Sequence, residues 1–399
     1  MSTCVSGKLL TPHSRIVFLP LFWVLSFFVL LPRTHATHPT APPLAERTAD
    51  GFLVPQTGRT FEFPKDHGSH PGFKLEWWYV TGHLFEVGTK ERFGFQATFF
   101  RRAGAPPGER VQKSGAFGSE QLFLFHAALL EVRTGKFLHT ERLSRVGWDA
   151  SSAEDTLDVQ LNGNRLFLDP AQPEIFHLDS RIRNEARLQL TLRPRKPLVV
   201  FGEDGVSRKG DSPEAASWYL TFPRLAAEGR LHFGGKTFVL GGEAWMDHEI
   251  SSSQLTQEQT GWDWAGIQFE DGREIMVYRL RRKDGSTDPA SALYWVDTTG
   301  KTIRFGSEAF RWEGATQWRS PRSGANYPLP VRLSVPDPAT GRDAEFLLEP
   351  LGTDQELGGG TSGIPYWEGA CRVKSNGKVV GSAYVELTGY AGSLSRALK

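Results

Sequence analysis

The sequence predicts an all-β protein with two consecutive β-barrels or sandwiches and little helix. Apolar and polar residues alternate with a period of two over Arg187–Leu192, which is typical of a half-buried strand. The chain has 42 Gly and 25 Pro, and helical periodicity is nearly absent. Two-residue hairpin signals stand between strand-like runs at Asn162-Gly163, Asp271-Gly272 and Asn376-Gly377.

Residues 1–36 have the pattern of an export signal. Lys8 and Arg15 precede the apolar run Ile16–Leu31, and small residues lead to a predicted cleavage after Ala36. The run contains Pro20 and is shorter than the roughly 20 residues that a membrane-spanning helix needs. We therefore expect an exported protein, periplasmic or extracellular, that meets the membrane only through its signal peptide.

The remaining chain divides into a linker and two domains. Residues 37–50 are rich in Pro and Ala and read as a linker. The Gly-rich stretch Glu228–Gly242 indicates a division between an N-terminal domain at 51–235 and a C-terminal domain at 236–392. Cys4 leaves with the signal peptide, so Cys371 remains alone and no internal disulfide can form.

Composition limits the classes of function. The chain has 46 Lys+Arg against 45 Asp+Glu, a formal net charge of +1. A nucleic-acid-binding protein of this size would usually carry a clear basic excess, so no nucleic-acid partner is expected. Hydrophobic residues at 39% and aromatics at 12% are sufficient for buried cores.

The common catalytic and cofactor motifs are missing or out of context. There is no G-x-S-x-G motif, and Gly358-x-Gly360-x-x-Gly363 lacks the strand before it and the helix after it that a dinucleotide site needs. Two short segments carry metal-ligand residue types without the spacing of a zinc site. These segments are Asp66-His67 with His70, and Asp247-His248-Glu249. The sequence therefore predicts neither a bound metal nor a cofactor.

Acidic residues interleave with aromatic ones in four segments. Because residues i and i+2 of a strand share a face, Trp262 and Trp264 should lie on one face with Asp263 on the other, and Trp245 should lie beside Asp247. This pattern predicts an aromatic-walled cavity with carboxyl groups, suited to a long apolar ligand. The segments are Glu76-Trp77-Trp78-Tyr79, Trp245-Met246-Asp247-His248-Glu249, Trp262-Asp263-Trp264 and Tyr366-Trp367-Glu368.

These acidic and aromatic residues are consistent with either acid catalysis or a purely structural role. A carboxyl group desolvated among Trp rings has a raised pKa and can act as a general acid, while aromatic faces stabilise a nearby cation. Together these would suit protonation of an alkene followed by capture of water. In the structural alternative, the Trp residues pack in the core and the acids accept hydrogen bonds from indole N–H groups.

Several blocks of sequence resemble the AttH/CrtC family, which is lipocalin-like. The family contains carotenoid 1,2-hydratases and exported bacterial proteins labelled secreted hydrolases, and this chain looks closer to the AttH branch. The resemblance implies two consecutive lipocalin-like (calycin-type) β domains and adds His126 to the candidate ligand-binding residues. The matching blocks are Phe63–Gly82, Phe125–Ala128, Gly242–Glu249, Gly261–Trp264, Tyr366–Gly369 and Tyr384–Tyr390.

Three functional hypotheses remain open. The first is an exported protein that binds a lipid or isoprenoid, accessory to an ABC transport system. The second is a cofactor-free hydratase of the carotenoid 1,2-hydratase kind, with Asp247 as the acid, Glu249 or His248 handling water, and Trp245, Trp262 and Trp264 stabilising a cation. The third is a secreted hydrolase. The expected ligand-binding residues are Glu76, Trp77, Trp78, Tyr79, His126, Trp245, Trp262, Asp263, Trp264, Tyr366, Trp367 and Glu368.

Overall fold

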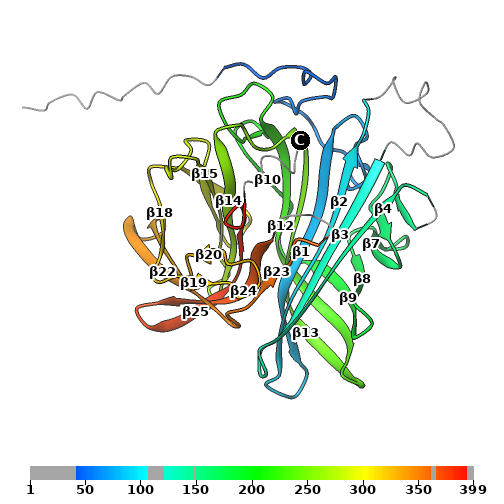
Figure 1. Ribbon diagram of the computed structural model, residues 1–399, viewed down its shortest axis with the longest axis vertical. Coiled ribbons are helices and arrows are strands. Elements are labelled where there is room, and N and C mark those ends of the chain that lie inside the picture. Colours follow the sequence, from blue (N-terminus) through cyan, green and yellow to red (C-terminus); the bar gives the residue numbers. More distant parts are fainter. Residues whose placement is uncertain (1–41, 107–120, 148, 361–364, 393–399) are drawn as a thin grey trace, which may run out of the picture. The chain divides into compact units, whose positions relative to one another are not determined.

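The computed structural model describes residues 42–106, 121–147, 149–360 and 365–392, and the expected signal peptide lies outside them. Within these ranges the chain is almost entirely β, with one short 3₁₀ turn, η1 (Lys65–His67). The predicted all-β class is therefore confirmed (Figure 1). No helix in the described ranges has the length and apolar character needed to cross a membrane.

The first sheet has thirteen strands in the described residues, all paired antiparallel. Its order is β4-β3-β2-β1-β13-β12-β9-β8-β7-β6-β5, with β10 and β11 also pairing with β12. The strands are β1 (Leu75–Glu86), β2 (Arg92–Ala103), β3 (Gln121–Glu131), β4 (Lys136–Arg145), β5 (Ala150–Ser152), β6 (Asp158–Leu161), β7 (Asn164–Leu168), β8 (Phe176–Ile182), β9 (Ala186–Pro194), β10 (Val199–Phe201), β11 (Ser207–Arg208), β12 (Ala216–Phe233) and β13 (Lys236–Ser253).

The first sheet curls around an apolar interior. One face of most of its strands supplies this core, which includes Trp78, Phe95, Phe99 and Met246. Strand β12 bends at a register shift between Phe222 and Leu225. Pro223 stands in this bulge, where its missing N–H breaks no ladder bond.

The second sheet has ten strands in the described residues and a core of its own. Its order is β17-β16-β15-β14-β25-β24-β22-β21-β18, with β23 pairing with β24, while β19 and β20 form a separate pair. The ten strands of the sheet are β14 (Gln259–Phe269), β15 (Glu274–Arg282), β16 (Ala292–Val296), β17 (Thr302–Gly306), β18 (Arg311–Gly314), β21 (Val331–Asp337), β22 (Arg342–Pro350), β23 (Glu356–Leu357), β24 (Tyr366–Ser375) and β25 (Lys378–Leu387). The separate pair consists of β19 (Trp318–Arg319) and β20 (Asn326–Tyr327).

The change from one sheet to the other falls between Ser253 and Gln259, not at residue 235 where the sequence analysis divided the chain. The Gly-rich stretch that suggested the earlier boundary is the hairpin between β12 and β13. Gly234 and Gly235 adopt positive φ there, which glycine tolerates without strain. The three hairpin signals named above also form turns, with positive φ at Asn162, Gly272 and Asn376.

The outward faces of the two sheets pack against each other. Strands β1, β2 and β12 contact β25, β24 and β14, and a third apolar cluster fills this interface. Gly94 on β2 meets Ala370 on β24 so closely that a Cβ on Gly94 would overlap with that of Ala370. Glu274 adds an ionic link, since it binds both Lys196 and Arg224 from the first sheet's side of the interface.

Candidate functional site

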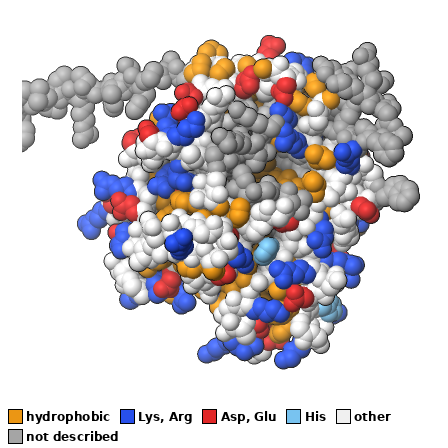
Figure 2. Space-filling model, in the orientation of Figure 1, with side chains coloured by type: hydrophobic (Ala, Val, Ile, Leu, Met, Phe, Trp, Pro, Cys, Tyr) orange, Lys and Arg blue, Asp and Glu red, His pale blue; other side chains and the backbone are white. Residues whose placement is uncertain are grey.

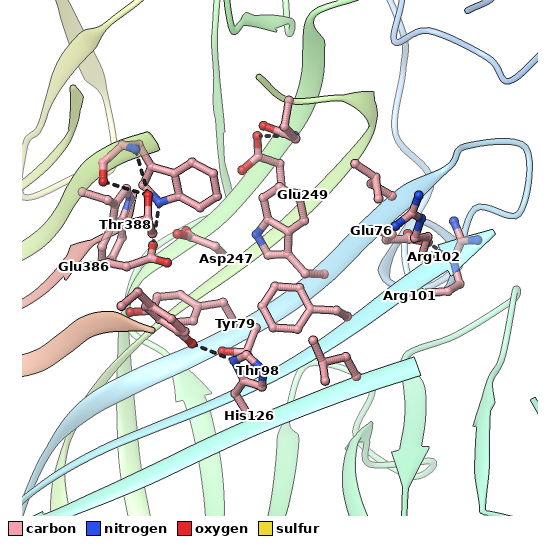
Figure 3. A pocket seen from close by; sticks show the side chains of 18 of the residues that line it. Glu76, Tyr79, Thr98, Arg101, Arg102, His126, Asp247, Glu249, Glu386 and Thr388 are labelled. Carbon is pink, nitrogen blue, oxygen red and sulfur yellow. Dashed lines mark hydrogen bonds and ion pairs between the residues drawn. The ribbon is translucent and has the colours of Figure 1, made fainter. Parts of the chain in front are cut away.

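A cavity of about 330 Å³ lies between the outward faces of the two sheets (Figure 3). Strands β1, β2, β3, β4, β12 and β13 supply one side, and β14, β15, β24 and β25 supply the other. This volume is in the usual range for a small-molecule site. The lining residues that matter below are Trp77, Tyr79, Phe100, Leu122, Leu124, His126, Leu143, Lys209, Tyr219, Asp247, Glu249, Trp262, Trp264, Tyr278, Tyr366, Glu368 and Glu386.

Asp247 is the buried carboxyl group at the centre of the first sheet's side. Its Oδ1 accepts hydrogen bonds from Thr221 Oγ1 at 2.6 Å and Trp245 Nε1 at 2.7 Å. Its Oδ2 accepts one from the Tyr219 hydroxyl at 2.7 Å. Burial raises the pKa of Asp247 to about 7, against the opposing effect of these three donors, and the charge of Glu249 adds to the rise.

Aromatic side chains surround this carboxyl. Trp264 Nε1 donates to the Tyr219 hydroxyl at 2.9 Å, which continues the hydrogen-bonded chain to Asp247. Trp264 also packs edge-on against Tyr79 and Trp245, with ring centroids 5.4 and 6.0 Å apart. Asp247 is therefore held by the indole N–H of Trp245 and, through Tyr219, by that of Trp264.

Glu249 is a second carboxyl group on the same face of β13, two residues along. It binds Lys209 Nζ at 2.8 Å and accepts a hydrogen bond from Gln254 Nε2 at 3.2 Å. Lys209 is itself buried over the rings of Tyr219 and Tyr278. Lys209 therefore places a positive charge against Glu249, next to Asp247, whose neutral form is favoured by burial.

A further pair of carboxyl groups lies on the second sheet's side. Glu368 and Glu386 are direct cross-strand partners on β24 and β25. Burial raises the pKa of Glu368 to about 7, against the polar side chains of Tyr79, Gln96 and Tyr366. Burial and the charge of Glu368 raise the pKa of Glu386 well above its usual value. Trp262 Nε1 donates to Glu386 Oε2 at 2.9 Å.

The structure brings most of the predicted site residues together. Residues that line the cavity are Trp77, Tyr79, His126, Asp247, Glu249, Trp262, Trp264, Tyr366 and Glu368. Trp245 stands behind Asp247 and holds it through the indole N–H, so it is a positioning residue. The expected alternation of Trp262 and Trp264 against Asp263 is confirmed, because the two Trp line the cavity while Asp263 binds Arg279 and Tyr390.

Other predicted residues point away from the cavity, because neighbours along a strand alternate between its faces. Trp78 and Trp367 belong to the interior cores of the first and second sheet. His248 stacks on Trp78, with ring centroids 4.8 Å apart, on the interior face of β13. His248 therefore does not share a site with Asp247.

Glu76 borders the cavity, but its carboxylate serves a network on the interior face. Its Oε2 accepts from Arg101 Nε at 2.9 Å, and its Oε1 lies 2.8 and 2.9 Å from ring nitrogens of His70 and His248. Burial alone would raise the pKa of Glu76, but the charges of Arg101 and His70 hold it well below its usual range. His70 also contacts Asp66, and these carboxylates raise its pKa to about 9 against the effect of burial.

The ring and carboxylate atoms of His70, Glu76 and His248 are grouped closely enough to hold a metal ion. Their chemistry fits a hydrogen-bonded ion-pair network better. The Arg101 guanidinium already neutralises Glu76, and a protonated His70 donates from both ring nitrogens. A divalent cation would have to displace that proton and stand beside the guanidinium.

Sequence reasoning missed several cavity residues. Tyr219 and Thr221 lie in Ser217–Thr221, whose period-two pattern could have placed them on one face. Glu386 lies in the block Tyr384–Tyr390, and alternation would have grouped it with Tyr384 and Thr388. Lys209 follows the short strand β11, and nothing in its local sequence indicates a buried ion pair.

One edge of the cavity is apolar and partly open. Leu122 and Leu143, from neighbouring strands β3 and β4, remain 38% and 52% exposed although both line the cavity. Figure 2 shows hydrophobic side chains on both sides of the grey residues of the face in view. An apolar ligand could therefore enter over this edge and reach the carboxyl groups beyond it.

Comparison with known proteins agrees with this architecture. The AttH-like family matches residues 54–390 of the chain. The crystal structure assigned to AttH of Nitrosomonas europaea has 34% sequence identity and a TM-score of 0.73, covering 84% of this chain and 98% of that one. A search of curated proteins found no significant match.

A more distant structure shares the fold. Kievitone hydratase from Nectria haematococca has 14% identity and a TM-score of 0.63, covering 88% of this chain and 97% of that one. At this identity the likeness concerns the fold alone. The match over residues 54–390 and the 34% identity to the Nitrosomonas protein show that the chain is a member of the AttH-like family, with two lipocalin-like β sheets.

Proposed function

We propose that this protein is a cofactor-free hydro-lyase that adds water to a carbon–carbon double bond of a largely apolar small molecule. The observation that carries the proposal is Asp247, a buried carboxyl with a pKa of about 7, set among Tyr219, Trp245 and Trp264 in an apolar cavity. A general acid is most effective when its pKa lies near the working pH.

Two carboxyl groups of β13 carry out the proton transfers of the proposed reaction, Asp247 as the acid and Glu249 as the base. Protonated Asp247 gives its proton to one alkene carbon, and the π electrons form the new C–H bond, leaving a carbocation on the other carbon. The faces of Trp262 and Trp264 stabilise that cation. Water adds to the cation and loses a proton to ionised Glu249. Transfer of a proton from Glu249 back to Asp247 restores the starting state, so the net change is addition of one water.

The test uses the chain from Thr37 onward with a panel of isoprenoid and other unsaturated compounds. Incubation in heavy-oxygen water should yield a product that carries one labelled oxygen. The product should be lost in Asp247→Asn while the compound still binds. If Asp247→Asn formed product at the wild-type rate, the assignment of Asp247 as the acid would be overturned.

A second candidate is a carrier that binds the same class of ligand without changing it. The partly exposed Leu122 and Leu143 at the cavity edge favour this candidate, since they suit ligand exchange. A compound that co-purifies unchanged and shows no labelled product over long incubation would favour the carrier. A hydrolase has no comparable support, because no Ser or Cys lines the cavity within the described residues.

Export and partnership belong to the same proposal. A signal peptide that ends at Ala36 would deliver the mature chain outside the cytoplasm, where an ABC transport system could supply or receive its ligand. N-terminal sequencing of the protein from a periplasmic or culture fraction should begin at Thr37. An intact Met1 would contradict export by this signal.

A further inference from the structure

Nη1 of the lining residue Arg101 is buried without a partner, but the other nitrogens of that guanidinium bind Glu76 and backbone carbonyls. Three further buried polar atoms in the cavity have no hydrogen-bond partner in the described part of the chain. They are the Tyr79 hydroxyl, His126 Nε2 and Glu368 Oε1. Their residues are only 7%, 2% and 1% exposed, and all three line the cavity. A buried polar group without a partner is costly, so a cluster of three in one cavity needs an explanation.

The remaining polar atoms of Glu368 and His126 do have partners within the protein. Glu368 Oε2 accepts from Gln96 Nε2 at 3.0 Å, and the Thr98 hydroxyl lies 3.4 Å from the Gln96 amide oxygen. His126 Nδ1 lies 2.7 Å from the Tyr366 hydroxyl, and Figure 3 shows His126 and Tyr79 on the same wall. The Tyr79 hydroxyl lies near enough to Glu368 to lower the pKa of that carboxyl, although neither Tyr79 Oη nor Glu368 Oε1 has a partner with full hydrogen-bond geometry.

The surroundings of this cluster define the rest of the ligand. Phe100 packs edge-on against His126 with centroids 5.3 Å apart, and Leu124 lines the same side of the cavity. The cluster is thus a small polar spot on an apolar wall. It lies on β1, β3 and β24, and its Tyr79 is directly opposite Asp247 in the pairing of β1 with β13.

We propose that Tyr79, His126 and Glu368 form a polar subsite that binds an uncharged oxygen, a hydroxyl or carbonyl, on the otherwise apolar ligand. This inference rests on the proposed function, since it names the substrate class of the same cavity. A ligand hydroxyl can accept from Tyr79 and donate to Glu368. A ligand carbonyl can accept from Tyr79 and from the protonated form of Glu368.

The subsite also excludes two other ligand classes. A pure hydrocarbon leaves all three polar atoms unpaired, which lowers affinity. A carboxylate brings a negative charge against Glu368 and its cross-strand neighbour Glu386, and the subsite residues Tyr79, His126, Tyr366, Glu368 and Gln96 include no Lys or Arg to offset it. The substrate class is therefore an oxygenated but uncharged unsaturated molecule, an alcohol or a ketone.

Three probes with one fifteen-carbon skeleton test the inference: farnesene, farnesol and farnesoic acid. Their affinities for the chain from Thr37 onward are measured by calorimetry, below the concentrations at which the probes aggregate. Farnesol should bind about 10-fold tighter than either of the others at neutral pH. In Tyr79→Phe, which removes only the unpaired hydroxyl, farnesol should weaken about 3- to 10-fold while farnesene is unchanged.

Tyr278→Phe is the matched control. It also removes a tyrosine hydroxyl that lines the cavity, but that hydroxyl lies 3.1 Å from Ser207 Oγ within the protein. It should leave the preference for farnesol intact. Glu368→Gln supplies a second variant, and thermal melting by circular dichroism verifies that each variant is folded.

Each result has a defined meaning. Equal binding of farnesene and farnesol, or an unchanged preference in both Tyr79→Phe and Glu368→Gln, would overturn the subsite and leave the proposed cavity chemistry standing. Failure of every probe and of the wider compound panel to bind the wild type would overturn the proposed function, and the subsite with it. Tightest binding by farnesoic acid would show a cationic subsite instead.

Discussion

Glu368 on β24 and Glu386 on β25 lie directly opposite each other across two paired strands, both facing the cavity between the sheets. Like charges in such a cross-strand pair repel, and burial adds to the penalty, so the neutral forms are favoured. On the facing sheet, burial and the charge of Glu249 raise the pKa of Asp247 in the same way. The cavity therefore concentrates carboxyl groups that stay protonated near neutral pH.

The first prediction concerns stability against pH. Asp247 and Glu368 each have a folded-state pKa of about 7, above their unfolded values of 3.8 and 4.5. The stability that these two neutral carboxyl groups contribute to the folded state is therefore fully present below about pH 4 and is lost as the pH rises toward 7. The free energy of unfolding should fall by up to about 1.4 kcal/mol per pH unit for each group across this window.

Denaturant unfolding of the wild type and of Glu368→Gln from pH 4.5 to 7.5 provides the measurement. The variant, which cannot ionise there, should show a shallower slope. Comparing the two removes shared contributions, such as that of His70, whose raised pKa of about 9 adds a loss of stability at higher pH. Parallel slopes for the two proteins would contradict the raised pKa of Glu368.

The second prediction separates catalysis from binding. Asp247→Asn keeps the size of the side chain but removes the proton donor, so kcat should fall at least about 100-fold with the ligand Kd changed by less than about 5-fold. Stopped assays with heavy-oxygen water measure the rate, and calorimetry measures Kd. Asp158→Asn, at an exposed ion pair that does not line the cavity, serves as the control and should keep kcat within a few-fold of the wild type.

The third prediction concerns the buried ion pair of Glu76 and Arg101. Glu76→Gln leaves the charges of Arg101 and His70 without their buried counter-ion, so the variant should lose about 3–5 kcal/mol of unfolding free energy. The exposed pair of Asp158 and Arg165 is the contrast, and Asp158→Asn should cost under about 1 kcal/mol. Equal losses in urea unfolding would mean that the buried network contributes no more to stability than an exposed ion pair.

The fourth prediction concerns the close contact between the two sheets. Gly94→Ala places a methyl group against that of Ala370, so it should destabilise the protein by about 1–3 kcal/mol. Ala370→Gly removes the opposing methyl, and the double variant should recover most of the loss. A double-mutant cycle by thermal unfolding measures this coupling. Additive losses would show that the two residues do not limit the approach of the sheets.

Much of the fold follows from local sequence patterns. Period-two alternation and hairpin dipeptides predict strands and turns without knowledge of distant residues, and alternation alone placed Trp262 and Trp264 opposite Asp263. The boundary between the sheets did not follow, because the glycines near residue 235 mark a hairpin inside the first sheet. A glycine-rich turn looks the same within a sheet as between two sheets.

The sequence likewise predicted only part of the candidate site. The sequence alone determined which residue types could form an acidic, aromatic cavity, and it placed Trp245 beside Asp247 by their spacing on one strand. Only the tertiary structure decided that His248 faces the first sheet's interior, that Tyr219, Glu386 and Lys209 join the cavity, and that Glu368 meets Tyr79 and Gln96. Those relationships depend on strand order and on how two sheets pack, which are set by contacts between residues far apart in the chain.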